Sequence, residues 1–225
     1  MLELADTGGR RRKQARPREL LDAALAVFVE KGFAAARADE IAARAGVSKG
    51  TLYLYFDSKE DLLRTLIAEG FSSRIELRAH QVTASSGASG ELLLQALTAW
   101  WFSLAEGQAG GIFKLMLTEV RNFPGLADCW NREVMDPVRG LVSRIVLRGI
   151  DRGEFRPVDP DLVAHALMLP IVMACLHRHT IGPRVPDDFL MHAPDLLGRH
   201  IELVLEGLNW HPDRGQEGGA ASAGA

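Results

Sequence analysis

The stretch from Asp39 to Lys59 constrains the fold of this chain more than any other. Apolar residues in its first part recur at the spacing of a short amphipathic helix, which Gly46 ends. A glycine there allows the positive φ angle of a tight turn, and Ser48 then stands where a helix N-cap is needed. A second helix is expected from about Lys49 to Phe56. Two short helices joined by a glycine turn, the second with a small, basic and aromatic outer face, are typical of a DNA-reading helix-turn-helix.

Residues before and after this stretch extend the pattern. The residues that carry it are Gly32-Phe33, Ile41-Ala42, Ala45-Gly46-Val47-Ser48-Lys49-Gly50, Leu52-Tyr53, Tyr55-Phe56 and Lys59-Glu60. Together they resemble the DNA-binding signature of TetR-type (TetR/AcrR) transcriptional regulators, over the part of the chain from Arg18 to roughly Ile67. The resemblance implies an all-α protein with an N-terminal three-helix bundle that contains the helix-turn-helix. A larger helical domain for ligand binding and dimerisation would follow it.

The resemblance also implies which residues of the head contact DNA. The family usually carries hydroxyl residues before the first motif helix, whereas Ala36-Arg37-Ala38 stands here, so Arg37 takes over any contact at that point. Lys49 would face the major groove, and Gly50 would let the backbone approach the DNA. The alternative for the tyrosines is that they pack into the core. The expected contact residues are Arg37, Ser48, Lys49, Gly50, Thr51, Tyr53, Leu54, Tyr55 and Lys59.

The same stretch satisfies a second motif. Gly46–Gly50 reads G-x-S-x-G, which in serine hydrolases places a nucleophilic serine, here Ser48, on a strained turn between a strand and a helix. The residues before Gly46 have helical spacing and no β-branched run, so the required strand is not expected. A hydrolase is therefore the weaker reading, and no enzymatic activity is predicted.

Composition and charge fit a helical DNA-binding protein. Leu and Ala dominate, and no alternating β pattern occurs. The net charge is −3, but residues 1–66 carry +2 and the remainder −5, as expected for a DNA-binding head on an acidic body. Arg10–Arg18 contains six basic residues and no acid, which suits either a solvated tail or an arm that follows DNA phosphates. The predicted regions are residues 1–17 as a flexible basic arm, 18–80 as the DNA-binding domain with its linking helix, 81–210 as the effector-binding and dimerisation domain, and 211–225 as a disordered tail.

Bulky apolar side chains gather in the helices predicted after Glu91. They provide more bulk than a tight core requires, so we expect a largely apolar effector cavity among them. An ordinary core is the alternative. Glu119 and Asn122 are among the polar groups available to orient a ligand. The expected cavity residues are Trp100, Trp101, Phe113, Met116, Leu117, Val120, Trp130, Val134, Met173 and His177.

The last helix carries two apolar stripes, which implies two packing surfaces, one in its own subunit and one on another chain. The resemblance implies that the last two helices form a four-helix dimer interface. The expected interface residues are Leu167, Ile171, Leu190, Leu197, Ile201, Val204 and Leu208.

Three prolines and one loop are expected to shape the helices of this region. Pro137 and Pro170 lie inside predicted helices, and each removes one i→i−4 hydrogen bond. Pro170 thereby frees the carbonyl of Ala166, which must find another partner, such as a water or a ligand. The segment Ala84–Gly90 is predicted to be a flexible loop. A further helix is predicted to begin at Pro124.

The chain is therefore interpreted as a homodimeric repressor that binds a palindromic double-stranded DNA operator and is released by a small, largely apolar effector. A constitutive DNA-binding protein without an effector is the alternative. No cofactor is expected, and His177 and His179 are too close in sequence to share one face of a helix and bind a metal. The two cysteines are expected to be buried thiols, and a cytoplasmic location without a membrane span is predicted.

Overall fold

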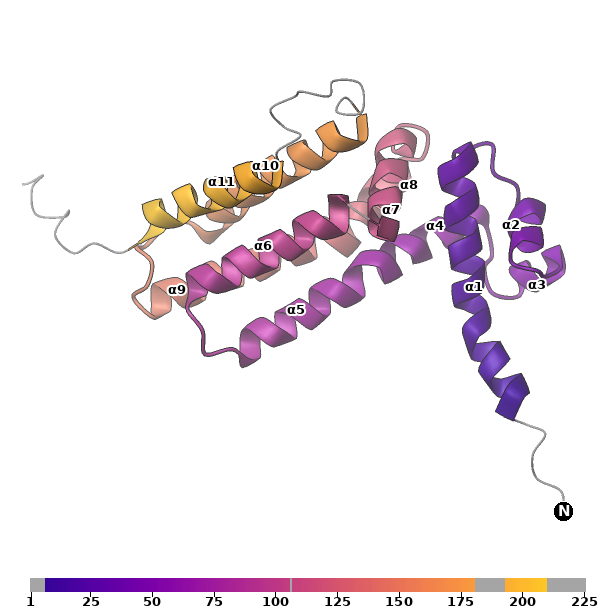
Figure 1. Ribbon diagram of the computed structural model, residues 1–225, viewed down its shortest axis with the longest axis horizontal. Helices are drawn as coiled ribbons and strands as arrows, with labels where there is room; N and C mark the ends of the chain where they lie inside the picture. Colours follow the sequence, from indigo (N-terminus) through magenta and orange to yellow (C-terminus); the bar gives the residue numbers. More distant parts are fainter. Residues whose placement is uncertain (1–6, 106, 181–192, 210–225) are drawn as a thin grey trace, which may run out of the picture. The chain divides into compact units, whose positions relative to one another are not determined.

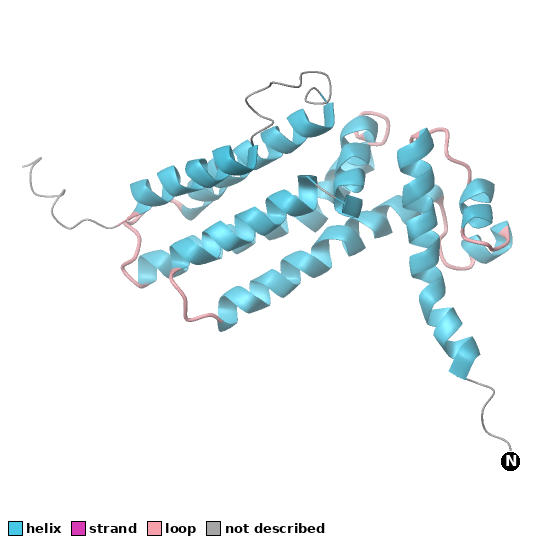
Figure 2. Ribbon diagram, viewed as in Figure 1, coloured by secondary structure: helices cyan, strands magenta, loops and turns pink. Residues whose placement is uncertain are grey.

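The computed structural model describes residues 7–105, 107–180 and 193–209, which are almost entirely helical (Figures 1 and 2). These residues contain no strand, and their one isolated β-bridge joins Phe155 to Asn209. The all-α prediction is confirmed, while the predicted tail, 211–225, lies outside the described residues. The elements are α1 (Thr7–Lys31), α2 (Ala38–Arg44), α3 (Lys49–Tyr53), α4 (Lys59–Ile67), the π-helical turn η1 (Ala68–Ser72), α5 (Ser73–Ala84), α6 (Ser89–Ala105), α7 (Gly107–Glu119), α8 (Pro124–Trp130), the π-helical turn η2 (Asn131–Met135), α9 (Asp136–Asp151), α10 (Pro160–Thr180) and α11 (Ala193–Leu208).

The chain forms two compact units. The first contains residues 1–77 and 103–137, and the second contains residues 78–102 and 138–225. The first unit therefore holds the predicted DNA-binding head together with α7 and α8, which the sequence had placed in the effector domain. Packing explains the difference, because α7 lies against α1 and both α7 and α8 lie against α4.

Helices α1, α2 and α3 enclose the core of the head. Phe28 and Phe33 are fully buried with ring centroids 5.1 Å apart, and Ile41 and Leu52 close the core from α2 and α3. Gly32 ends α1 with a φ of +79°, the left-handed conformation that favours glycine after a helix. The chain can therefore turn sharply and place Phe33 back into the core.

The N-terminal part of α1 occupies much of the predicted arm. A flexible segment was expected over residues 1–17 and a helix from Pro17, but α1 begins at Thr7. Arg, Lys, Gln and Ala between these points are strong helix formers, which explains the longer helix. Residues 1–6 lie outside the described part of the chain.

The helix that leaves the head is interrupted by η1, where one continuous helix was expected. A second π-helical turn, η2, packs against η1 and directly precedes α9, whose second residue is Pro137. Because Pro137 has no N–H, the carbonyl of Glu133 lacks its α-helical donor. The hydroxyl of Ser72 in η1 donates to that carbonyl at 3.2 Å. The distortion expected at Pro137 is thus the widened turn η2 just before it. The Glu133 carbonyl that Pro137 leaves free accepts a hydrogen bond from η1.

Pro170 in α10 also leaves a backbone carbonyl without its helical donor. It lies in the second unit, where α10 packs against α11. Pro170 leaves the Ala166 carbonyl without its helical donor, and Nε2 of His200 on α11 donates to it at 3.0 Å. The prediction that this carbonyl needs a partner outside its own ladder is confirmed. The partner is a side chain of the next helix.

Two arginines, Arg148 on α9 and Arg152 directly after it, bind the segment that was predicted to be a flexible loop. Arg148 donates to two carbonyls of residues 85–88 at 2.8 and 3.0 Å. Arg152 donates to carbonyls of the same segment at 3.3 and 3.4 Å. The glycine and serine content of the loop could not reveal these contacts, because they come from a distant helix.

Glu154 completes this anchor by accepting a hydrogen bond from the backbone N–H of Ser89 at 2.6 Å. It also forms an ion pair with Arg152 at 2.9 Å. Partial desolvation raises the pKa of Glu154, but the hydrogen bond from Ser89 and the charges of Arg152 and Arg148 outweigh it, so the pKa lies below its ordinary value.

Candidate nucleic-acid interface

The helix-turn-helix forms where the sequence places it. Gly46 has a φ of +67°, which lets the chain turn between α2 and α3. Ser48 caps α3, because its hydroxyl accepts a hydrogen bond from the backbone N–H of Thr51 at 3.1 Å. α3 ends at Tyr53, earlier than the predicted Phe56, and the following residues continue as a turn.

The outer face of this motif is exposed and has the predicted chemistry. The exposed fractions are 45% for Tyr53, 82% for Leu54 and 38% for Tyr55, so the tyrosines are not core residues. A Cβ at Gly50 would meet nothing closer than the Ser48 hydroxyl at 3.8 Å. Packing within the chain therefore does not require glycine at position 50. A close approach from outside, such as that of a DNA backbone, would explain it.

Lys59 has a different environment from the predicted phosphate contact. Its ammonium donates to the carbonyls of Phe33 at 2.7 Å, Ala34 at 3.2 Å and Ala36 at 3.2 Å. It also lies 4.5 Å from the centroid of the Phe33 ring. An ammonium group has three N–H donors, so all three are engaged. Lys59 ties the start of α4 to the turn after α1, and the prediction of a DNA contact is corrected accordingly.

Asp39 is a residue of this surface that the sequence reading missed. Its carboxylate lies 3.3 Å from the guanidinium of Arg37 and 3.2 Å from the ammonium of Lys49. The backbone N–H of Asp39 itself and the hydrogen bond from Lys49 hold the pKa of this carboxyl below its ordinary value. In the sequence, Asp39 stands out only as the first residue of the motif, and the contact with Lys49 depends on how α2 and α3 pack.

Glu119 links α7 to the turn after α1 within the first unit. This carboxylate is 7% exposed and accepts hydrogen bonds from the backbone N–H of Phe33 at 3.3 Å and from Nδ2 of Asn122 at 3.1 Å. The ring of Phe123 meets Phe33 edge-on, with centroids 4.7 Å apart. The sequence had offered Glu119 as a ligand-orienting group, but it supports the head instead.

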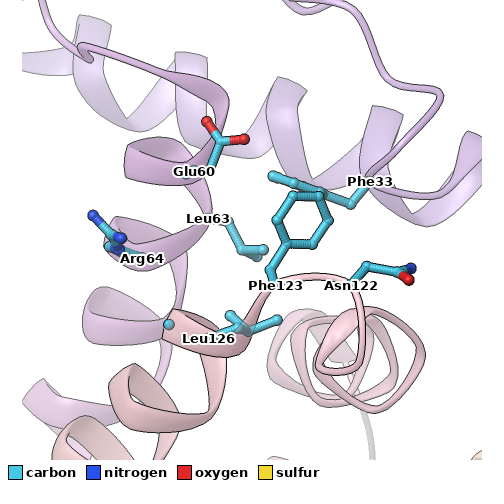
Figure 3. Close-up of a pocket in the computed structure, with 8 residues that line it drawn as sticks. Phe33, Glu60, Leu63, Arg64, Asn122, Phe123 and Leu126 are labelled. Carbon is cyan, nitrogen blue, oxygen red and sulfur yellow. The ribbon is translucent and has the colours of Figure 1, made fainter.

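A hollow of about 190 Å³ lies beside this contact. Figure 3 shows that Leu63 of α4, Leu126 of α8 and the rings of Phe33 and Phe123 point toward one another around it. Its walls are mainly apolar, and Glu60 is at the rim. The segment after α7 and the start of α4 therefore both contact Phe33, which is a core residue of the head.

The predicted cavity residues divide between the two units. In the first unit, Trp130 packs on Phe113 and Phe71 with ring centroids 5.4 and 5.1 Å apart, so the aromatic side chains form a packed cluster there. The remaining predicted members in this unit are Met116, Leu117, Val120 and Val134; Met116 and Val134 are buried, and the other two are half-buried.

In the second unit, Trp100, Trp101 and His177 are buried, whereas Met173 is 58% exposed and does not line an enclosed cavity in its own subunit. The indole N–H of Trp100 is buried and has no hydrogen-bond acceptor among the described residues. Buried donors are normally satisfied, so this group is a candidate contact for a bound polar atom.

Most of the predicted dimer residues lie in the core of the subunit. Leu167, Ile171, Leu197, Ile201 and Leu208 are all at most 4% exposed, so they cannot meet another chain. Val204 is half-buried and Leu190 lies outside the described residues. The reason for the error is that sequence periodicity identifies two stripes on a helix but does not show which one faces its own subunit.

A different set of apolar residues is exposed on the same two helices. Leu162, Leu169 and Met173 on α10 are 67%, 59% and 58% exposed, and Leu203 on α11 is 68% exposed. We call these four residues the α10–α11 stripe. Because of this apolar outer side, the segment Pro160–His179 is long and apolar enough to cross a membrane by length and composition, although 44% of it is buried. The prediction of no membrane span rested on the apolar run Ala166–Leu176, which is too short to cross a bilayer.

The described residues give little support to a metal site, a nucleophilic serine or a reactive thiol. They bring together no group of three or more His, Cys, Asp and Glu side chains that could hold a metal. Helix α2 precedes Gly46, in place of the strand that a nucleophilic Ser48 would need. Cys129 and Cys175 are buried, and burial raises the pKa of both thiols, that of Cys175 to about 12.

Comparison with known proteins agrees with this geometry. Residues 20–66 match the family "Bacterial regulatory proteins, tetR family", and residues 86–197 match "Tetracyclin repressor-like, C-terminal domain". The fatty acid metabolism regulator protein of Bacillus subtilis (strain 168) is 31% identical over 199 residues, covering 88% of this chain and 98% of its own. The HTH-type transcriptional repressor KstR2 of Rhodococcus jostii (strain RHA1) is 37% identical over 205 residues, covering 90% and 94%.

Solved structures show the same fold. The transcriptional regulator FadR from Bacillus subtilis in complex with stearoyl-CoA has a TM-score of 0.65 at 24% identity, over 85% of this chain and 99% of that chain. The fatty acid degradation regulator FadR from Bacillus halodurans has a TM-score of 0.68 at 24% identity, over 87% and 97%. The helix-turn-helix, the helical body and the full-length relatives lead to one conclusion: this chain belongs to the tetR family of bacterial regulatory proteins and is a DNA-binding transcriptional regulator.

Proposed function

We propose that this protein is a homodimeric repressor that binds a palindromic operator and leaves it when a largely apolar ligand binds. The exposed face of α3 carries the DNA-binding part of the proposal. Lys49 and Tyr53 on the capped helix α3, and Leu54 and Tyr55 in the turn that follows it, are exposed, and Gly50 leaves room for a phosphate backbone. Arg37, Ser48 and Thr51 complete the proposed contact surface.

Selection of bound duplexes from a random DNA pool tests this first step. Two recognition helices of a symmetric dimer would meet half-sites roughly 34–36 Å apart, which is one helical turn. We expect a palindromic consensus with that spacing. Binding that falls steeply with salt and shows no enriched sequence would instead identify a non-specific DNA-binding protein.

The α10–α11 stripe supports the dimer. Exposed leucine and methionine side chains on two helices that pack together are costly in water, and a second copy of the same surface would cover them. Leu203→Asp should reduce the mass measured by light scattering to that of a monomer and weaken operator binding. Leu147→Asp is the matched control, because Leu147 is 47% exposed on α9 and lies outside the stripe. A dimeric Leu203→Asp protein would place the interface elsewhere.

A long-chain acyl-CoA is the first ligand to test, because a FadR structure that shares this fold holds stearoyl-CoA and a 31% identical relative is a fatty acid metabolism regulator. Its acyl chain suits the predicted apolar lining, and the buried indole N–H of Trp100 could donate to a polar atom of the ligand. Stearoyl-CoA should raise the melting temperature and release the operator, whereas free CoA should do neither. Absence of any effect across acyl lengths would remove acyl thioesters as effectors.

Ligand release requires that the ligand bind the DNA-incompetent state more tightly than the competent one. A coupling of about 1–3 kcal/mol would suffice for a switch of this kind. The helix series α4, η1 and α5 starts in the head and continues beyond it along the chain, so it is the proposed carrier of the change.

A further inference from the structure

The carboxylate of Asp39 is bound to two cations on the proposed DNA-binding surface. Its Oδ2 lies 3.3 Å from Arg37 and its Oδ1 lies 3.2 Å from Lys49. Arg37 is the N-cap residue of α2, and Lys49 is the first residue of α3. A single acid in the first turn of α2 therefore connects the starts of both motif helices.

The other ion pairs of the head have a different position. Lys31 pairs with Glu40 at 2.9 Å, and Glu30 pairs with Arg44, so both of these pairs join α1 to α2. They fasten helices of the head to one another. Asp39 instead joins α2 to α3, and it engages the two side chains that are proposed to reach the DNA.

Both contacts of Asp39 are easily broken. The side chain of Arg37 is 71% exposed, that of Lys49 is 55% exposed and that of Asp39 is 48% exposed. Exposed ion pairs of this kind contribute little stability and exchange readily for other partners. They do, however, hold long side chains in one region, and the fixed negative charge remains when a DNA phosphate arrives.

We infer that Asp39 is a specificity-determining residue, which keeps Arg37 and Lys49 in place for the operator and opposes their capture by phosphates of unrelated DNA. The inference rests on the proposed function. Non-specific binding comes almost entirely from neutralised phosphates, so a nearby carboxylate weakens it directly. On the operator, base contacts by the positioned lysine offset the same repulsion.

The test compares Asp39→Asn with the native protein on two duplexes, the selected operator and a scrambled sequence of equal length, by fluorescence anisotropy over a range of salt concentrations. A unit charge a few ångströms from a phosphate in water predicts roughly three- to tenfold tighter binding of the scrambled duplex by the variant. Operator binding should stay the same or weaken, so the ratio of operator affinity to scrambled affinity should fall by at least threefold.

Glu30→Gln is the matched control, because it also removes one paired carboxylate from the head but does so away from Arg37 and Lys49. It should change both affinities by the same factor and leave their ratio unchanged. Asp39→Ser provides a second uncharged variant, and thermal melts check that each variant remains folded.

Three results would overturn the inference. If Asp39→Asn increased the affinity for both duplexes by the same factor, Asp39 would be an ordinary surface charge. A changed preference at one base pair without tighter scrambled binding would mean that the carboxylate itself reads a base. Failure of the native protein to prefer any duplex would reject the proposed function as well, and it would be seen before any variant is compared.

Discussion

Replacing Lys59 by Met separates a structural role from a DNA contact at this position. Met keeps the apolar stem but removes the ammonium that binds the carbonyls of Phe33, Ala34 and Ala36. The Ala34 oxygen is exposed and can be hydrated, whereas the Phe33 and Ala36 contacts are partly buried, and each such hydrogen bond contributes about 1 kcal/mol. The lost interaction with the Phe33 ring adds about 0.5–1 kcal/mol.

We therefore expect Lys59→Met to lower the free energy of unfolding by about 2–3 kcal/mol, which corresponds to a fall of about 4–12 °C in melting temperature for a chain of this size. Differential scanning calorimetry measures the change. The slope of log K against log salt for operator binding should stay the same, because no phosphate contact is lost. Lys49→Met is the control and should show the reverse, with an unchanged melt and weaker operator binding, because it removes a proposed base contact. An unchanged melting temperature together with a reduced salt slope for Lys59→Met would refute the assignment.

Other positions give equally specific expectations. Gly149→Ala should destabilise the protein by about 1–3 kcal/mol in urea unfolding, because a Cβ there would overlap the ring of Phe155; wild-type stability would show that the ring has room to move. Glu154→Gln should lower stability at pH 7, because the depressed pKa of the native carboxyl stabilises the fold. That difference should shrink as the pH falls below the unfolded value of about 4.5 and through the folded pKa, and a difference that persists at pH 2 would contradict it. Cys175 should resist alkylation at pH 8 until the protein is unfolded, because burial raises its pKa to about 12; rapid labelling of the native protein would show that the thiol is accessible.

Local chemistry was readable from the sequence wherever one residue type determines the backbone. Gly46 adopts the positive φ angle predicted for it, and Ser48 caps α3 as expected. Pro170 frees a carbonyl that finds another partner, as expected, although that partner is the side chain of His200 and a water or a ligand had been suggested. Each of these outcomes depends on a residue and its immediate neighbours, so the pattern along the chain contains the necessary information.

Contacts between distant segments were not readable. Lys59 and Phe33 are separated by a helix-turn-helix, and nothing in their spacing shows that the amine would reach three carbonyls. Glu119 belongs to a part of the chain assigned to another domain, yet it binds the backbone of Phe33. Both stripes of α11 contain apolar residues, so only the packed structure shows that Ile201 faces inward and Leu203 outward.

The hydrogen bond from His200 to the Ala166 carbonyl has a consequence for assembly. It joins α10 to α11 at the point where Pro170 interrupts the ladder of α10, so the two helices are held at a fixed register before any partner arrives. Leu169 and Leu203 are therefore presented on a preorganised surface, and association does not have to bear the entropic cost of aligning two independent helices. Loss of this one hydrogen bond should leave the apolar area unchanged and still slow or weaken the pairing of subunits.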